Sequence, residues 1–316
     1  FDISLRDGVL IGAAIIVAYT FLGGFLAVAI IDTLQGLLMA IVAIVLPVAA
    51  FLSIGGRSGL EAVLADLPDV YADPFGGRPG MIAAGFVVGL FATGFGALGQ
   101  PHLAAWIMAS RDAQARVKGA AIAIGWGTIV YAGMAVLGLS AHALFGAEAV
   151  AEGIFFAAAQ ELLPPVFAGI IVAATLSAIM STVDSQLLVA GSAVSHDLGA
   201  ARLAGGRTVL VSRIAILLLC LVAVMLTLGL PSTIFDRTLF AWTALGASFG
   251  PTVVFRALGW RPTGWGVALS IASGFGASLA YEFWLSVGPG AVWARTVPWG
   301  LAFLALMLGG RRYEHA

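Results

Sequence analysis

The chain has 316 residues, of which 61% are hydrophobic and only 10% are charged, and its formal net charge is -1. Soluble domains carry about 25% charged residues, so this composition leaves too little polar surface for a globule in water. The charge balance also argues against nucleic-acid binding, which needs a clustered basic surface. The single Cys220 excludes a disulfide framework and a multi-cysteine metal site.

Uncharged runs long enough to span a bilayer follow one another along the whole chain. A spanning helix needs about 20 mostly apolar residues, and only helices or closed barrels can cross lipid. These runs are too long for barrel strands, so we predict an all-α, polytopic membrane protein. Nine candidate helices cover residues 8–31, 33–56, 79–110, 119–147, 162–183, 214–235, 238–255, 262–281 and 296–310.

The basic residues are distributed unevenly between the two sides that this helix count defines. One set of loops holds ten Lys and Arg residues and the other set holds five. Because cytoplasmic loops carry the excess of Lys and Arg, the N-terminal end is expected outside and the C-terminal tail in the cytoplasm. We therefore predict a multi-pass plasma-membrane protein, in a bacterium the inner membrane, with the acidic loop 57–78 on the external side.

The run 79–110 carries helix breakers at its centre. Glycine is a poor helix former and proline removes a backbone donor, so the helix is expected to unwind here. Discontinuous helices bind substrates and ions in secondary transporters. Close helix packing or a simple proline kink is the alternative. The breakers are Gly94, Gly96, Gly99 and Pro101, and the polar residues Gln100 and His102 lie among them.

A second unusual segment, residues 175–186, places five hydroxyl side chains, one carboxylate and one amide in a spanning helix. The Ala178 carbonyl and the Ser181 and Thr182 hydroxyls share one helix face, because their spacing is i, i+3 and i+4. Such neutral oxygens suit a small cation stripped of water. The alternative is a packing face whose hydroxyls bond back to the preceding turn. A lone Asp184 costs about 2.5–3.5 kcal/mol in lipid, so it should lie near the cytoplasmic end, face water or have a partner.

Four motifs stand out by their order and spacing: GGFLAVAIIDTLQ (23–35), GQPHLAAWIMAS (99–110), AIMSTVDSQLLVAGSAVSHDL (178–198) and AWTALGASFGPTVVFRALGW (241–260). Together they resemble the sodium/solute symporter family, most closely its sodium/proline symporter branch. The resemblance implies a thirteen-span protein with a ten-helix core, made of two inverted repeats of five helices each, with discontinuous helices. This chain is similar to spans five to thirteen of that fold.

The resemblance implies a transporter and not an enzyme, with sodium as the coupling ion and no cofactor. It places Ala178, Ser181 and Thr182 on the sodium-ligand positions. Asp184 is expected either to hold the cytoplasmic end of the ion path or to pair with a nearby cation. The broken helix is implied to bear the solute, and the candidate residues are Thr93, Gly94, Ala97, Gln100 and Pro101.

Two departures from the pattern bear on the substrate. Thr93 and Ala97 stand where proline transporters of the family are expected to have aromatic residues, which puts proline itself in question. Ile30 and Ile31 replace a Trp-Thr pair expected before Asp32.

The expected organisation follows the repeats. Residues 1–56 would be the last two helices of the first repeat, 57–78 an external loop, 79–260 the first four helices of the second repeat with their loops, and 261–316 the last core helix, peripheral helices and a short tail. The first core helix, which should complete both the sodium and the solute sites, would lie outside this chain, so the chain looks incomplete.

The predicted function is sodium-coupled symport of a small organic solute by alternating access, with proline or a related amino acid as the first candidate. The expected partners are that solute, sodium and the lipid bilayer, and no nucleic acid. Three alternatives remain: a symporter for another substrate, the membrane sensor domain of a kinase-like receptor, and an inactive truncated relic.

Overall fold

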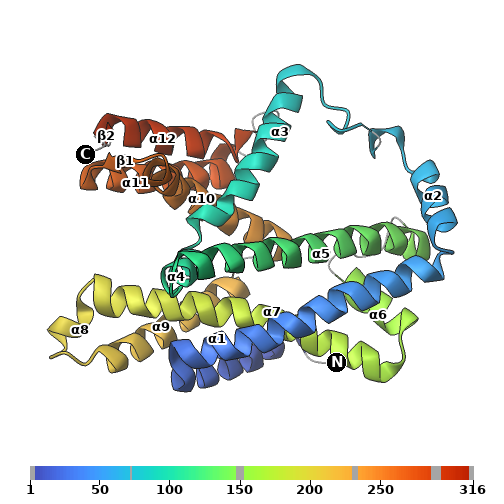
Figure 1. The fold of residues 1–316 in the computed structure, drawn as a ribbon, viewed down its shortest axis with the longest axis horizontal. Helices are drawn as coiled ribbons and strands as arrows, with labels where there is room; N and C mark the ends of the chain where they lie inside the picture. The colour runs from blue at the N-terminus through green and yellow to red at the C-terminus, as the bar shows by residue number, and fades with distance from the viewer. Residues whose placement is uncertain (1–3, 72, 147–152, 230–233, 286–292, 313–316) are drawn as a thin grey trace. The chain divides into compact units, whose positions relative to one another are not determined.

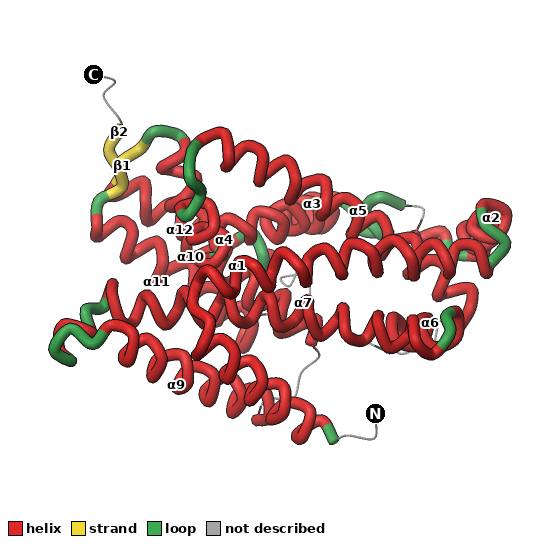
Figure 2. Tube along the Cα trace, turned by 60° about the horizontal axis from the view of Figure 1, so that its bottom comes forward, coloured by secondary structure: helices red, strands yellow, loops and turns green. Residues whose placement is uncertain are grey.

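The computed structural model describes residues 4–71, 73–146, 153–229, 234–285 and 293–312, and helices dominate all of them (Figures 1 and 2). The predicted all-α class is confirmed. In chain order the helices are α1 (Leu5–Ser53), α2 (Arg57–Asp66), η1 (Asp69–Tyr71), α3 (Gly80–Phe95), η2 (Gly96–Gly99), α4 (Pro101–Met108), α5 (Ala113–Phe145), α6 (Ile154–Leu162), α7 (Pro165–Ser192), η3 (Ala193–Asp197), α8 (Ala200–Leu203), α9 (Thr208–Gly229), α10 (Ile234–Ala257), α11 (Gly264–Ala280), η4 (Tyr281–Leu285) and α12 (Val297–Gly309).

Within the described residues, two short strands form the one element that is not helical. β1 (Trp260–Pro262) pairs antiparallel with β2 (Gly310–Arg312), and Arg261 lies opposite Arg311 in the register. The pair joins the chain after α10 to the chain after α12.

Six stretches of helix in the described residues are long and apolar enough to cross a membrane: Val28–Ser53, Gly80–Gly99, Ala113–Phe145, Pro165–Asp197, Thr208–Gly229 and Ile234–Ala257. The last two predicted spans are helical but shorter, because α11 has 17 residues and α12 has 13. The apolar surface of these helices is largely uncovered. On α5, for example, Ile122, Ile124 and Tyr131 are each more than 70% exposed, as expected of side chains that face lipid tails.

The structure differs from the prediction over the first two spans. Residues expected to form two helices, 8–31 and 33–56, form the single helix α1 of 49 residues. At about 1.5 Å per residue, this helix is longer than twice the roughly 30 Å hydrocarbon core. Neither the Gly23-Gly24 pair nor Asp32 interrupts it, because none of these residues removes a backbone donor, and even Pro47 lies inside the helix.

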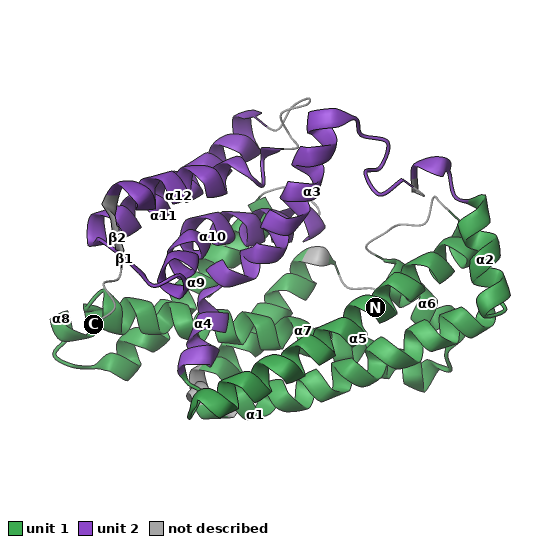
Figure 3. Cartoon of the chain, turned by 45° about the horizontal axis from the view of Figure 1, so that its top comes forward, with its two compact units in different colours: residues 1–66, 109–231 green, residues 67–108, 232–316 purple. Residues whose placement is uncertain are grey.

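The chain divides into two compact units, each built from two separate stretches of sequence (Figure 3). Unit 1 comprises residues 1–66 and 109–231, and unit 2 comprises residues 67–108 and 232–316. This division groups the broken helix with the C-terminal helices. The predicted segments are defined by the inverted repeats and not by compactness, so this division does not test them and they stay a prediction. Their bounds are 1–56, 57–78, 79–260 and 261–316.

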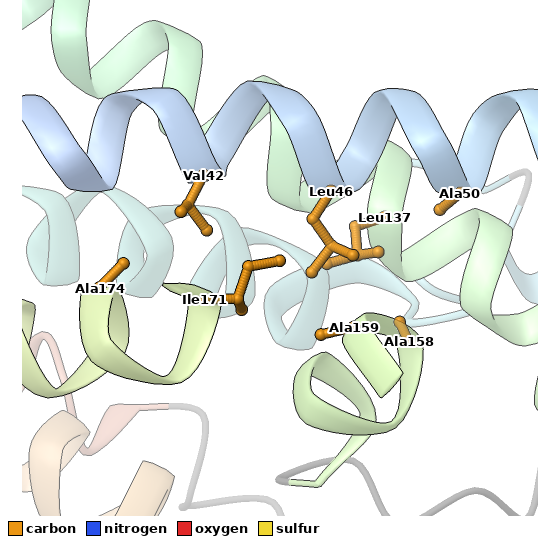
Figure 4. Close-up of a cluster of buried hydrophobic side chains, with 8 residues drawn as sticks. All are labelled: Val42, Leu46, Ala50, Leu137, Ala158, Ala159, Ile171 and Ala174. Atoms are coloured by element: carbon orange, nitrogen blue, oxygen red, sulfur yellow. The ribbon is translucent and has the colours of Figure 1, made fainter. Parts of the chain in front are cut away.

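In unit 1, helix α1 packs along α5, α7 and α9. Small residues let these helices approach closely: a Cβ added at Gly133 of α5 would overlap the Ala43 carbonyl oxygen of α1. Figure 4 shows the apolar side chains that α1 directs at α7 and at its neighbours. This core cluster consists of Val42, Leu46, Ala50, Leu137, Ala158, Ala159, Ile171 and Ala174.

In unit 2, helix α10 is the central element and packs against α3, η2, α11 and α12. Ala247 of α10 is fully buried in a cluster with Ala92 of α3 and Trp299 of α12. A Cβ at Gly274 of α11 would overlap the Ala247 carbonyl oxygen, so here too the backbones touch. The broken helix is therefore held by α10 at the centre of this unit.

Candidate functional site

The predicted break in the 79–110 segment is confirmed. Helix α3 ends at Phe95, a 3-10 turn follows over Gly96–Gly99, and Gln100 has an extended backbone with φ -82° and ψ 113°. Helix α4 then starts at Pro101, where the missing proline N–H removes no helix bond. The chain thus changes direction within one apolar segment, and carbonyls of the last α3 turn lose their i+4 donors. The Thr93 carbonyl accepts the Gly96 N–H instead.

Two glycines of the break are explained by packing. A Cβ at Gly96 would overlap the indole of Trp242, and one at Gly99 would overlap the Leu245 carbonyl oxygen. The turn therefore lies with its bare backbone directly on α10. For these two positions the close-packing alternative describes the structure, whereas Gly94 has open space where its Cβ would be.

The candidate solute residues lie together along this break but differ in exposure. Thr93 and Ala97 are half-buried, Gly94 and Pro101 are exposed, and Gln100 is 3% exposed. Gly94 borders an open apolar hollow of about 400 Å³ on α3. Its neighbours there are the side chains of Val87, Leu90, Phe91 and Phe95.

Both polar groups of Thr93 already have partners within unit 2. Its hydroxyl donates to the Gly89 carbonyl at 2.9 Å, and its carbonyl accepts a hydrogen bond of 2.7 Å from the indole Nε1 of Trp242. Thr93 can therefore shape the surface of the break, but its hydrogen-bonding groups are engaged without any solute.

The candidate sodium ligands lie on α7, in unit 1. The Thr182 hydroxyl donates to the Ala178 carbonyl oxygen, and these two oxygens are 3.1 Å apart. Ala178 and Ser181 are half-buried and Thr182 is exposed. The two oxygens are close enough to contact one ion together, because a hydroxyl and a carbonyl each have a second lone pair. In the same geometry, the hydroxyl makes the bond to the preceding turn that the packing alternative describes.

Asp184 lies one turn further along α7 and is completely buried. Neither of its carboxyl oxygens has a hydrogen-bond partner in the residues that the structure describes. The side chain that lies beside it is Tyr19 of α1, whose hydroxyl donates to the Met180 carbonyl at 3.2 Å. Next to Asp184, Ser185 donates to a carboxyl oxygen of Asp32 on α1 at 3.1 Å. The α1–α7 contact thus brings two carboxyl groups into one apolar setting.

One of the candidate sodium ligands, Ala178, borders a hollow in unit 1. A space of about 310 Å³ lies between α1, α5, α6 and α7, and Ala178 and Thr175 form part of its wall. The remaining wall is apolar and includes Phe155 and Phe156 of α6. This places one expected ligand, the Ala178 position, in the wall of an open, mostly apolar hollow in unit 1.

The sequence analysis did not identify three residues that the structure places at the α3–α4 break or at the α1–α7 contact. Asp32 divided two predicted spans and was not considered as an intramembrane acid, although an ionisable residue inside an apolar helix is a functional candidate by default. Tyr19 and Trp242 carry no comparable signal, since their hydrogen bonds to α7 and α3 join residues 161 and 149 positions apart.

The chain is similar in sequence to transport proteins over most of its length. It is 30% identical over 300 residues to the osmoregulated proline transporter OpuE of Bacillus subtilis. The aligned region covers 91% of this chain and 59% of that relative. It is 33% identical over 277 residues to the high-affinity proline transporter PutP of the same organism, and the aligned region covers 85% of this chain and 58% of that relative. It is 34% identical over 275 residues to the sodium/proline symporter of Escherichia coli, covering 83% and 54%.

The chain thus spans little more than half the length of these curated relatives. The sequence profile of the sodium:solute symporter family matches residues 1–270, which include α1, the broken helix, the hydroxyl-bearing face of α7 and α10. With this match over most of the described helices and with the similarity to the three transporters, the chain belongs to the sodium:solute symporter family.

Proposed function

We propose that the full-length protein containing this chain couples the entry of sodium to the uptake of a small organic solute. Family membership and the printed activities of the relatives support this proposal. The single observation that carries it is the oxygen pair on α7, where the Thr182 hydroxyl lies 3.1 Å from the Ala178 carbonyl.

In this mechanism, sodium binds the oxygens of Ala178, Ser181 and Thr182. The Thr182 hydroxyl turns its proton away from the Ala178 carbonyl, so that both oxygens present lone pairs to the ion. Because Thr182 is exposed on this chain, a further segment has to cover it. The first core helix implied by the family resemblance fills that role.

Asp184 is proposed to lie on the ion path. A buried carboxylate without a hydrogen-bond donor is costly unless a cation or a proton neutralises it. Asp32 adds a second carboxyl group close to it instead of a compensating positive charge. This arrangement favours an entering cation over a static ion pair.

The solute is proposed to bind at the break between α3 and α4, along the surface formed by Thr93, Gly94, Ala97, Gln100 and Pro101. Proline is the first candidate, because the three relatives named above are proline transporters or symporters. The small side chains at Thr93 and Ala97 leave room for a larger or differently shaped solute, so a related amino acid is the second candidate.

Sodium supplies enough free energy for concentrative uptake. One charge moving through about 100 mV releases about 2.3 kcal/mol, and a tenfold sodium gradient adds about 1.4 kcal/mol. Together these terms support solute accumulation of several hundredfold. Coupling requires that sodium and solute bind the outward-open and inward-open states with different affinities, since equal binding shifts no equilibrium.

The proposal is tested by sodium-dependent uptake of labelled proline and of competing amino acids into cells or vesicles containing the full-length protein. Thr182→Ala should raise the sodium concentration for half-maximal uptake at least tenfold, because it removes one oxygen ligand from a desolvated ion. The matched control is Thr128→Ala on α5, where an exposed threonine makes the same kind of bond to the Ile124 carbonyl.

Unchanged sodium dependence in Thr182→Ala would remove the α7 site. An equal loss in Thr128→Ala would show that the effect is structural. If the protein takes up no amino acid but takes up another solute with sodium, the proposed sodium symport stands and the proposed substrate class is wrong.

A further inference from the structure

Trp242 makes a contact that the proposed transport cycle has not used. It lies half-buried on α10, and its indole Nε1 donates to the Thr93 carbonyl at 2.7 Å. Thr93 lies in the last turn of α3, just before the break. Carbonyls in that turn lose their i+4 donors when the helix ends. The Thr93 carbonyl accepts the Gly96 N–H of the 3-10 turn instead, and the indole adds a second donor that links the turn to α10.

The same indole also packs against the backbone at the start of the 3-10 turn. Gly96 begins the 3-10 turn, and a Cβ there would overlap the Trp242 ring. Gly246, one turn further along α10, faces Gly96 in turn. One side chain of α10 thus bonds the last turn of α3 and packs directly against the first residue of η2.

We propose that Trp242 is a positioning residue of the solute site, which keeps the α3–η2 break formed when no solute is bound. The inference rests on the proposed function and deepens it. A carbonyl oxygen can accept two hydrogen bonds, and here the two donors are the Gly96 N–H and the indole. Without the indole, the turn loses its hydrogen bond to α10 and is free to shift, and such a shift moves the surface that receives the solute.

This role predicts a specific kinetic signature. A preformed site does not have to be ordered when the solute binds, and this saves binding free energy. Trp242→Phe keeps an aromatic ring at this position of α10 and removes the indole N–H donor. It should therefore raise the solute KM about tenfold, equivalent to about 1.4 kcal/mol, while the maximal rate and the sodium half-saturation at saturating solute stay within about twofold.

The matched control is Trp126→Phe on α5. Trp126 is also half-buried, and its indole Nε1 donates to the Gly36 carbonyl of α1 at 3.2 Å. The same substitution there removes the same kind of bond in unit 1, so it should leave the solute KM unchanged. Both variants are measured in the full-length transporter, with membrane abundance determined alongside uptake.

A second variant keeps the inference testable if Trp242→Phe does not accumulate. Gly96→Ala leaves the indole donor in the sequence but adds a methyl group that overlaps the ring, and it too should raise the solute KM. If the variant that accumulates has the same solute KM as the parent, the proposed role of Trp242 is wrong. It is also wrong if Trp126→Phe raises the solute KM by the same factor. If the parent shows no sodium-dependent uptake of any solute, the proposed function fails, and this inference fails with it.

Discussion

Asp184 is a carboxylic acid that is completely buried on α7, beside Tyr19 and Asp32 of α1. Its carboxyl oxygens have no hydrogen-bond donor among the described residues, and Asp32 lies close by with a second carboxyl group. A helix that served only as a packing element would gain by replacing this acid with a small apolar residue. The cost of keeping it is therefore an argument for a role in binding a cation.

We expect Asp184→Asn to raise the sodium half-saturation of uptake about tenfold in the full-length protein. The amide keeps the size of the side chain but removes the negative charge that attracts the ion, and a tenfold change corresponds to about 1.4 kcal/mol. The control is Asp197→Asn in η3, an exposed acid beside His196. If both variants retain the parental sodium dependence, Asp184 is not on the ion path.

At the scale of elements, glycine determines how closely η2 approaches α10. A Cβ at Gly99 would overlap the Leu245 carbonyl oxygen, which is backbone and cannot rotate away. By contrast, Gly138 on α5 has open space around its position. The two glycines therefore have different physical roles, although both lie within apolar helical segments.

Gly99→Ala should destabilise unit 2 by about 1–3 kcal/mol, the usual cost of overpacking. Gly138→Ala should be neutral or stabilising by up to about 1 kcal/mol, because alanine is the better helix former. Thermal unfolding of the purified protein in detergent measures both variants. An equal Tm for Gly99→Ala and the parent would show that η2 does not pack on α10 as described.

The loop before α5 offers a pH-dependent test of a helix end. Asp112 is the N-cap of α5, and its carboxylate accepts the Ala115 N–H at 2.7 Å and lies 3.0 Å from the Arg111 guanidinium. The Ala115 N–H, followed by Arg111, holds the pKa of the Asp112 carboxyl below its usual range. Folding thus favours the charged form.

The stabilisation by Asp112 should be fully present above the unfolded-state pKa of about 3.9 and lost as the pH falls through the lower folded-state pKa. Asp112→Ala should therefore lower the Tm at neutral pH, and the difference from the parent should shrink at acidic pH. Asp112→Asn, which still caps the helix, should keep most of the Tm. A difference that grows on acidification would contradict this assignment.

At the scale of the whole molecule, the described helices show a chain of the sodium:solute symporter family with its apolar surfaces largely uncovered. The unequal distribution of basic residues over its loops still predicts which side each loop occupies. Loop 57–78 is expected outside, and loop 199–207, with Arg202 and Arg207, is expected in the cytoplasm.

Cysteine labelling tests this sidedness in the full-length protein, in a background where Cys220 and any cysteine outside this chain are replaced by serine. A membrane-impermeant maleimide should label Ser58→Cys in intact cells and label Ala204→Cys only after the membrane is opened. Both positions are exposed, so access depends on the membrane and not on packing. Labelling of Ala204→Cys in intact cells would reverse the predicted orientation.

Local chemistry made several features predictable. The break at Gly96–Gly99 follows from clustered glycines, which are poor helix formers, and a proline, which lacks a backbone donor. The spanning helices follow from the length of the apolar runs. The merging of the first two spans into α1 was not predictable in this way. In the sequence, the charge of Asp32 predicts a boundary between two spanning helices. In the structure, Asp32 lies inside α1, and its carboxyl oxygen accepts a hydrogen bond from the Ser185 hydroxyl of α7.

By itself, the sequence determined the membrane class, the helical content, the position of the break and the family motifs, since each depends on composition or on residues near one another in the chain. Only the tertiary structure decided that Gly96 and Gly99 lie against α10, that Trp242 bonds Thr93, and that Asp184 is buried beside Asp32 and Tyr19. These facts depend on which helices pack together and in which register. Apolar helix faces are alike in composition, so packing between distant segments cannot be read from either segment alone.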